Sequence, residues 1–534
     1  FIAKRPISRF LSAFLILALT VVYGAGNYYI FKTNEMFASV TNLTDQMTNT
    51  ISVVTLNGSG YDSLESLNNM TLGTITSQDS EGTQKALDDI SSKITVETVD
   101  YTTFSDLYYA LYTDQVQGII LNETFRGIVF EMDPDANNMT SVVNQTVYYT
   151  KRETKTDTVK DSVNVATEPF TILISGNDSY GGLTSNSRSD SNMLVTVNPS
   201  THTVLMTSIP RDYYETIQCG DTDTGLACPQ DERDKLTHSG LYGIDTTEKT
   251  IEEFLDITIN YHVRVNFSSL TNLVDALGGI DVFVEEGLAV EQFNADWSLQ
   301  GVTEGWNHLD GKRALAYARE RHAYVDGDIQ RAKNQQQVLE AIITKAASST
   351  ILTNYTQLLQ SFSGAFDTNM STDEITTLIR YELQALPEWK FENYVLRGYG
   401  DMAVCASSNM ELSVVVPEDY SVQIASQKIQ AVLDGGSADE VVDEYETESG
   451  GVAEGYIEQE NAEAYGQYYY DPNQYYDSSQ TYDQSQTYDQ SQTYDQSQTY
   501  DPSQVYDDSG VYDDSQYYDQ SQGYTEGTDT TYGQ

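Results

Sequence analysis

A stretch of 22 residues without a charged side chain, residues 10–31, constrains this chain more than any other feature. At a rise of about 1.5 Å per residue, a helix of this length spans about 33 Å, enough to cross the hydrocarbon core of a bilayer. Lys4, Arg5 and Arg9 precede the stretch, and basic residues favour the cytoplasmic side of a membrane. We therefore expect one membrane-spanning helix with the N-terminus in the cytoplasm and the remaining chain outside. A cleaved signal peptide is the alternative, because small residues follow Tyr23.

The charge of the chain is negative and unevenly distributed. The sequence has 28 basic and 80 acidic side chains, a net charge of −52, which argues against binding nucleic acid through a basic surface. Lys428 is the last basic residue, and 24 acidic residues follow position 433. The first 433 residues keep 28 basic and 56 acidic side chains, so a local group of arginines stands out there.

Four segments follow from composition and pattern. Residues 1–33 form the cytoplasmic stub and membrane helix, and the first residue is Phe1 and not Met, so we expect further chain upstream. Residues 34–167 are a small accessory α/β domain, residues 168–436 are an α/β domain with its motifs in 168–350, and residues 437–534 are a tail.

The tail repeats Tyr every six residues from Tyr476 to Tyr524 and has almost no aliphatic residues, which predicts disorder. It is either a solvated spacer or a series of Tyr side chains that stack on sugars or self-associate. Deleting everything after residue 436 is expected to leave activity intact.

Short alternating runs predict the secondary structure of the two folded segments. In the accessory domain, strands are expected at 51–56, 71–76, 94–99 and 118–121 and helices at 81–93 and 103–113. This domain has no phosphate loop, metal-ligand spacing or activated nucleophile, so no chemistry is assigned to it. In the second domain, apolar runs bounded by Gly, Pro, Asn or Ser predict buried strands, and longer runs at helical spacing predict helices. The strands are expected at 171–175, 193–197, 204–209, 263–267, 280–284 and 411–416, and the helices at 246–255, 268–277, 311–320, 329–347 and 373–384. The fold class is therefore α/β, a sheet covered by helices.

The three cysteines are too few for a disulfide scaffold and wrongly spaced for a zinc site. Cys219 and Cys228 are close enough in sequence to close a loop in an oxidising compartment, and two ordinary thiols are the equal alternative. Cys405 has no partner nearby in sequence.

Two acids and several arginines fall at the ends of predicted strands and helices. Asp178 follows the first strand of the second domain, Arg188 and Asp190 lead into the second strand, and Arg211 follows the third. A sheet gathers such positions along one edge, where open α/β folds commonly bind ligands. Mg²⁺ is usually held by one or two carboxylates plus substrate phosphates, which suits the acids, and guanidinium groups bind phosphate oxygens through paired hydrogen bonds. Further polar positions follow at Arg319, Arg321, Asp328, Arg331 and Gln335, of which the last lies four residues after Arg331 on the same helix face. Together they indicate a site for a pyrophosphate.

The motifs that carry these residues, in order, are GND, SRSD, TSIPRD, DKLTHSGLYG, NLVDALGGIDV, YARERH and DIQRAKNQQ. In this order and spacing the chain resembles the LytR-CpsA-Psr family of bacterial cell-envelope proteins. The resemblance implies an Mg²⁺-dependent phosphotransferase outside the membrane, in a Gram-positive type of envelope. Such an enzyme moves a glycopolymer, wall teichoic acid or capsular polysaccharide, from a polyprenyl-pyrophosphate carrier to peptidoglycan. It also implies that Asp178 and Asp190 hold the metal and that the pyrophosphate is bound by Arg188, Arg211, Arg319, Arg321, Arg331 and Gln335. The insert at 218–234 departs from the family, and Lys235 after it is a weaker candidate for a phosphate contact.

The mechanism expected from this set is in-line attack at phosphorus, in which metal and arginines stabilise the developing charge. Asp328 is the candidate general base, beside Arg319 and Arg321 as catalytic arginines. His202, His238 and His262 are expected to be structural. Apolar residues in the predicted helices form either an ordinary core or a slot for the lipid chain, namely Phe254, Leu255, Leu270, Leu273 and Leu277.

Two other functions remain to be weighed. Water can replace the sugar hydroxyl as acceptor, so the same site fits a pyrophosphatase or a lipid-phosphate-binding regulator. A transcriptional attenuator, an older label of the family, is disfavoured because an acidic domain that faces outward has no route to DNA.

Overall fold

The computed structural model describes residues 46–133, 135–151, 163–177, 183, 185–221, 224–325, 327–346, 366–385 and 387–444. The predicted membrane helix, the Tyr-rich tail beyond residue 444 and Asp178 lie outside these ranges. Among the helices in the described ranges, none is both long enough and apolar enough to span a bilayer.

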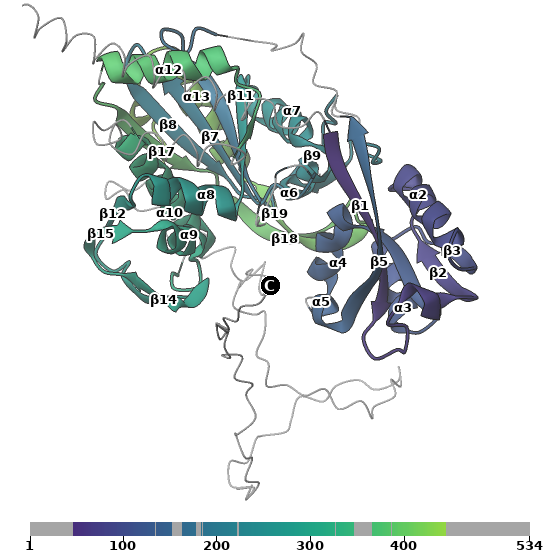
Figure 1. The fold of residues 1–534 in the computed structure, drawn as a ribbon. Helices are drawn as coiled ribbons and strands as arrows, with labels where there is room; N and C mark the ends of the chain where they lie inside the picture. The colour runs from purple at the N-terminus through teal and green to yellow at the C-terminus, as the bar shows by residue number, and fades with distance from the viewer. Residues whose placement is uncertain are drawn as a thin grey trace, which may run out of the picture. The chain divides into compact units, whose positions relative to one another are not determined.

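Five strands build the sheet of the N-terminal domain in the order β3-β2-β4-β1-β5 (Figure 1). β1 is a long inner strand and pairs antiparallel with both β4 and β5, whereas β2 pairs parallel with β3 and β4. Asp79 caps α2 by accepting a hydrogen bond from the backbone of Gly82, and Thr103 caps α3 in the same way at Asp106. The elements are β1 Gln46–Leu56, η1 Leu64–Leu67, β2 Met70–Thr74, α2 Ser80–Ser91, β3 Val96–Asp100, α3 Phe104–Tyr112, β4 Gly118–Asn122, η2 Glu123–Phe125, α4 Arg126–Met132, α5 Ala136–Met139 and β5 Thr140–Lys151.

The second domain is built on a six-stranded sheet in the order β16-β11-β6-β7-β8-β17 within the described residues. β7 runs antiparallel to both β6 and β8, while β11 pairs parallel with β6 and β17 parallel with β8. The strands are β6 Phe170–Gly176, β7 Ser191–Asn198, β8 Thr203–Ile209, β11 Tyr261–Val265, β16 Asp367–Thr368 and β17 Lys390–Val395.

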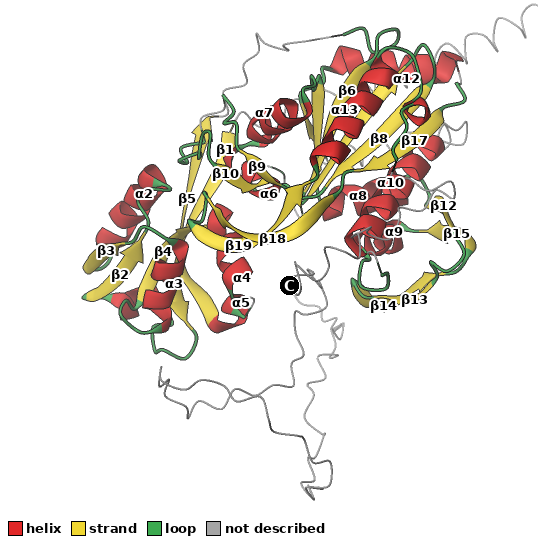
Figure 2. Ribbon diagram, turned by 180° about the vertical axis from the view of Figure 1, so that it is seen from behind, coloured by secondary structure: helices red, strands yellow, loops and turns green. Residues whose placement is uncertain are grey.

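Alternation along these strands divides the core between the two faces of the sheet. On one face Leu173, Leu194 and Leu205 pack with α7 (Ile244–Leu255) and α13 (Asp419–Leu433). On the other face their neighbours in sequence pack with α10 (Gly327–Ala346) and α12 (Thr372–Ala385). The domain is therefore a mixed α/β sheet covered by helices on both faces, as Figures 1 and 2 show from opposite sides.

A smaller group of elements packs beside α10 around its own apolar cluster. It contains α8 (Phe267–Ala276), β12 (Ile280–Val284), β13 (Val290–Phe293), β14 (Asp296–Val302), β15 (Gly305–Leu309) and α9 (Gly311–Arg319). The strand predicted at 263–267 is displaced by two residues from β11, Tyr261–Val265, because Asn266 leaves the strand and caps α8 by accepting a hydrogen bond from the backbone of Ser269. The remaining elements are β9 Tyr214–Thr216, β10 Arg233–Lys235, α6 Leu236–Ser239, η3 Gly240–Tyr242, β18 Gly398–Cys405, β19 Met410–Pro417 and η4 Ala438–Glu440.

Cys219 and Cys228 form a disulfide, with their Cα atoms 6.1 Å apart. Cys405 is a free, buried cysteine. The pairing settles the alternative that the sequence left open between a small closed loop and two thiols.

The packed chain extends beyond residue 436, where the sequence-based boundary was placed. Asp443 is buried and forms an ion pair at 2.6 Å with Nη1 of Arg397 and accepts a hydrogen bond from the hydroxyl of Tyr394. Nζ of Lys428 donates to the backbone carbonyl of Ala438. A cut after residue 436 therefore removes part of the core as well as the tail.

Truncation after Glu444 should leave the free energy of unfolding unchanged, whereas truncation after Gly436 should lower it by about 3 kcal/mol. The reason is that loss of Asp443 leaves the mostly buried guanidinium of Arg397 without one of its two acidic partners. Urea unfolding of the two shortened chains measures the difference. Equal stability would show that residues 437–444 contribute no packing.

Candidate active site

The antiparallel middle strand of the sheet brings three chain segments to one edge. The register pairs Gly176 with Ser191 and Asn192 with Ile209, so the end of β6, the start of β7 and the end of β8 lie side by side. Asp190 and Arg211 stand directly beyond these paired positions, and Nη1 of Arg211 lies 3.2 Å from Oδ1 of Asp190. Asp178 lies outside the described residues, so its expected place at this edge stays a prediction.

Three hydrogen bonds join the arginine-bearing helices α9 and α10 to each other and to this edge. The side chain of Asn334 on α10 donates to the carbonyl of Tyr317 on α9, and Gln335 donates to the carbonyl of Ala318. The hydroxyl of Ser191 donates in turn to Oε1 of Gln335 at 2.9 Å, which ties α10 to the start of β7. The helix spacing predicted for the Arg and Gln positions thus places both at the sheet edge.

These elements enclose a cavity of about 630 Å³. One part of its wall is polar and is formed by Asp190, Arg211, Arg319, Arg321, Arg331 and Gln335. The other part is apolar and includes Ile174, Met193, Val263, Leu270, Leu273 and Ile342. Of the five apolar residues for which core and lipid slot are the alternatives, Leu270 and Leu273 line the cavity and also pack against a core cluster, whereas Phe254, Leu255 and Leu277 pack in the core clusters and do not line the cavity.

The arginines of the polar wall are held by acids and by an aromatic ring. Asp212, and then Asp190, raises the pKa of Arg211 above its ordinary value, so this group stays charged. Burial lowers the pKa of Arg331, opposed by Asp328 at 3.1 Å from its Nη1. The guanidinium of Arg319 stacks 4.3 Å from the ring centre of Phe267. The wall is therefore a set of cations in fixed positions.

Asp328, the residue expected to act as base, lies in the first turn of α10 and is half exposed. Its Oδ1 contacts Arg331 and lies 3.6 Å from Nη1 of Arg321. It is near the polar wall but does not line the cavity.

Arg188 differs from the other sequence-predicted arginines because it does not line the cavity. Its Nη1 forms an ion pair at 2.7 Å with Glu131 on α4 of the N-terminal domain, and its Nε lies 3.8 Å from Oδ1 of Asp190. Lys235 also contacts Glu131, at 2.9 Å. Glu131 is not marked as a site residue by any local sequence pattern, because its partners are more than 50 residues away. Asp212 stands within the TSIPRD motif, so the sequence did carry a signal for it, but it is not among the predicted site residues.

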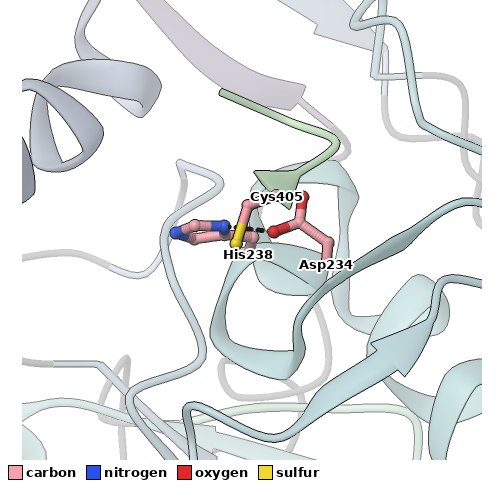
Figure 3. A group of neighbouring side chains, drawn as sticks. All are labelled: Asp234, His238 and Cys405. Atoms are coloured by element: carbon pink, nitrogen blue, oxygen red, sulfur yellow. Dashed lines mark hydrogen bonds and ion pairs between the residues drawn. The ribbon is translucent and has the colours of Figure 1, made fainter. Parts of the chain in front are cut away.

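A buried group behind this site joins Asp234, His238 and Cys405 (Figure 3). Nδ1 of His238 lies 2.6 Å from Oδ1 of Asp234, and its Nε2 lies 3.5 Å from Oε1 of Glu131. Burial opposes protonation of His238, but Asp234 and Glu131 together raise its pKa to about 9. Both carboxylate oxygens of Asp234 accept backbone N–H groups, from Lys235 and from Ser407. The group is thus a hydrogen-bonded ion pair of Asp234 and His238, in which Nε2 of His238 has the 3.5 Å contact with Glu131 but no hydrogen bond within the described residues. The structural role of His238 stays a prediction.

The residues present fit a magnesium ion only in part. Asp190 places one carboxylate on the cavity wall, and Mg²⁺ is commonly held by one or two carboxylates together with phosphate oxygens of a substrate. The second expected ligand is Asp178, which is not among the described residues.

Comparison with known proteins gives related sequences. A model of the LytR_cpsA_psr family matches residues 137–403. The chain is 33% identical over 231 residues to the polyisoprenyl-teichoic acid–peptidoglycan teichoic acid transferase TagU of Bacillus cereus AH820, an alignment that covers 42% of this chain and 68% of that protein. It is 35% identical over 236 residues to the corresponding transferase TagT of Bacillus subtilis 168, covering 43% and 67%. Among solved structures, a crystal structure of B. subtilis TagT is similar with a TM-score of 0.40 and 29% identity, covering 51% of this chain and 94% of that one.

Proposed function

Because the chain belongs to the LytR-CpsA-Psr family, we propose that it transfers a glycopolymer from a polyprenyl-pyrophosphate carrier to peptidoglycan. The observation that carries this proposal is the cavity, in which a wall of arginines continues into an apolar wall. A lipid diphosphate has the matching two-part chemistry. The names of the relatives state a teichoic acid for them, and the glycopolymer proposed for this chain is a wall teichoic acid or a capsular polysaccharide.

Arg211, Arg321 and Arg331 would bind the diphosphate oxygens, since these residues line the polar part of the cavity. The prenyl chain would occupy the apolar part, between Leu273 of α8 and Ile342 of α10. Burial of the chain there excludes water from the arginines and strengthens their interaction with the phosphates.

In the reaction, a hydroxyl oxygen of peptidoglycan attacks the phosphorus atom that carries the glycopolymer. An O–P bond forms, the phosphoanhydride P–O bond breaks, and its electron pair leaves with the polyprenyl phosphate. The arginines stabilise the negative charge on the transferring phosphoryl group and on the leaving phosphate. The hydroxyl proton passes to a base, for which Asp328 is the candidate because it stands beside the arginines and is accessible.

Mg²⁺ belongs to the proposal as an ion held by Asp190 and, by expectation, Asp178. When bound, it would neutralise diphosphate charge. The proposed location is the outer face of the cell membrane, with residues 10–31 as the anchor; the disulfide of Cys219 and Cys228 supports an oxidising compartment.

The proposal is tested by incubating the full-length chain in detergent with a polyprenyl-pyrophosphate-linked glycan, with and without peptidoglycan. We expect peptidoglycan-linked product only when both are present. Release of free phosphorylated glycan at the same rate in both samples would instead identify a pyrophosphatase. Binding of the lipid with neither product would identify a lipid-phosphate-binding regulator.

Substitution Leu273→Trp should raise the KM for a long-chain polyprenyl substrate about tenfold and change the KM for a ten-carbon prenyl substrate less than twofold. The larger ring narrows the apolar part of the cavity, and overpacking of this kind costs about 1–3 kcal/mol. Steady-state transfer with the two substrates measures the difference. Leu273→Met, which keeps the volume, is the control and should behave as the wild type. An equal rise for both chain lengths would place the lipid elsewhere.

A further inference from the structure

Six charged side chains form a closed ring in which acids and bases alternate, and we call it the charge ring. Its members are Glu131, Arg188, Asp190, Arg211, Asp212 and Lys235. The successive N–O distances around it are 2.7, 3.8, 3.2, 3.5, 3.5 and 2.9 Å. Three acids and three bases give the ring no net charge. Because acids and bases alternate, each member lies between two groups of opposite sign, which restricts the position of its side chain.

The ring connects the cavity with the N-terminal domain. Asp190 and Arg211 line the cavity, whereas Arg188, Lys235 and Glu131 do not. Within the described residues, Glu131 is the ring member that the N-terminal domain supplies. Its two oxygens are used separately, Oε1 for Arg188 and Oε2 for Lys235. It thus closes the ring on the side away from the substrate.

The position of Glu131 is fixed by packing of its own helix. Ile128 and Val129 on α4 belong to an apolar cluster that also contains Leu241 and Tyr242 of the second domain. Gly127 allows α4 to lie close to Arg188, because a Cβ atom at this position would stand 3.1 Å from Nε of that arginine. The helix therefore presents Glu131 to the ring at a set distance.

From this arrangement we propose that Glu131 is a positioning residue for the transfer reaction, acting through Arg188 and Lys235 on Asp190 and Arg211. The inference rests on the proposed function, because it assumes that the cavity binds the lipid diphosphate. The alternative is that Glu131 occupies the phosphate site in place of substrate, and in that case its carboxylate would lie among the arginines that line the cavity. Glu131 contacts ring members behind the cavity, so a bound diphosphate and Glu131 have separate places.

The test compares three variants of the full-length chain: Glu131→Gln, Glu131→Asp and Glu123→Gln. Glu123 is the matched control, because its contacts in the described part of the chain are with Arg126 and Ser52, inside the N-terminal domain and outside the charge ring. We expect Glu131→Gln to lower kcat about 10- to 100-fold and to change KM less than about threefold, since a small displacement of reacting groups costs this much. Glu131→Asp should recover most of kcat because it restores the charge. Glu123→Gln should keep the wild-type kcat.

Binding of geranylgeranyl pyrophosphate separates positioning from occupation of the substrate site. Its Kd should stay within about threefold of wild type in Glu131→Gln. A tighter Kd together with a faster rate would mean that Glu131 blocks the site, and an unchanged kcat would mean that it has no part in the reaction. Either result overturns the inference.

A double variant tests whether Glu131 acts through the ring. Glu131→Gln with Arg188→Gln should be no slower than the slower single variant, because both substitutions break the same contact. Multiplied losses would show independent effects and contradict the inference. If the wild type neither binds geranylgeranyl pyrophosphate nor transfers glycan, the proposed function itself fails. If Arg331→Ala transfers glycan slowly but Glu131→Gln transfers it at the wild-type rate, only the role of Glu131 is refuted.

Discussion

Replacing Arg331 with alanine should lower the rate of glycopolymer transfer about 100- to 1,000-fold while the protein remains folded. Arg331 is largely buried, lines the polar part of the cavity and is held by an ion pair with Asp328 in the first turn of the same helix, α10. Loss of one preorganised donor to a developing charge typically has an effect of this size. Transfer to peptidoglycan in single-turnover conditions measures the change.

The control for this substitution is Lys312→Ala, an exposed cation on α9, which should leave the rate unchanged. Arg331→Lys should recover only part of the rate, because an ammonium group cannot form the paired hydrogen bonds of a guanidinium. A full rate in Arg331→Ala would refute diphosphate binding at the polar wall.

Replacing Asp234 with asparagine should lower the free energy of unfolding by about 3–5 kcal/mol at pH 6. The substitution removes the nearer of the two anions beside the fully buried imidazolium of His238, at 2.6 Å, and leaves Glu131 at 3.5 Å; breaking a buried ion pair costs about this much. Urea unfolding at fixed pH measures the difference. The control is Asp281→Asn, which removes a similar contact, 2.7 Å from His308, at an exposed position and should cost less than about 1 kcal/mol.

The loss in Asp234→Asn should also depend on pH in a defined direction. The pKa of His238 is raised to about 9 in the folded chain from an ordinary value of 6.5. A raised pKa contributes stability that is complete below about pH 6.5 and is lost as the pH rises through about 9. The difference between wild type and variant should therefore shrink by roughly 2 kcal/mol between pH 6 and pH 10. A constant difference would show that Asp234 does not raise the pKa of His238.

The parts of the fold that were predictable from sequence are those with local signals. The runs at 171–175, 193–197 and 204–209 are apolar on both sides because helices cover both faces of the sheet, and they became β6, β7 and β8. The segment at 329–347 has helical spacing and became α10. Once these elements were placed, the site positions at their ends followed, and the structure brings Asp190, Arg211, Arg331 and Gln335 to one cavity.

The parts that sequence reasoning missed depend on contacts between distant segments. β5 pairs with β1 from about 90 residues away, and its exposed positions include Val142, Val147 and Tyr149, so no alternation of polar and apolar residues marks it in the sequence. In the sequence, Glu131 cannot be told from an ordinary surface acid, because its role depends on the packing of α4 beside Arg188. For α13 a signal was present, since Ile424, Ile429 and Val432 recur at helical spacing and form its buried side. The membrane anchor, the tail and Asp178 remain predictions.

The apolar cluster of α4 is shared, because Phe125, Ile128 and Val129 pack with Leu241 and Tyr242. Neither domain encloses this cluster alone. Separately expressed halves are therefore expected to aggregate or to bind one another. For the same reason, a chimera that joins this N-terminal domain to the second domain of a relative must keep both sides of the shared contact, residues 125–131 and residues 235–242.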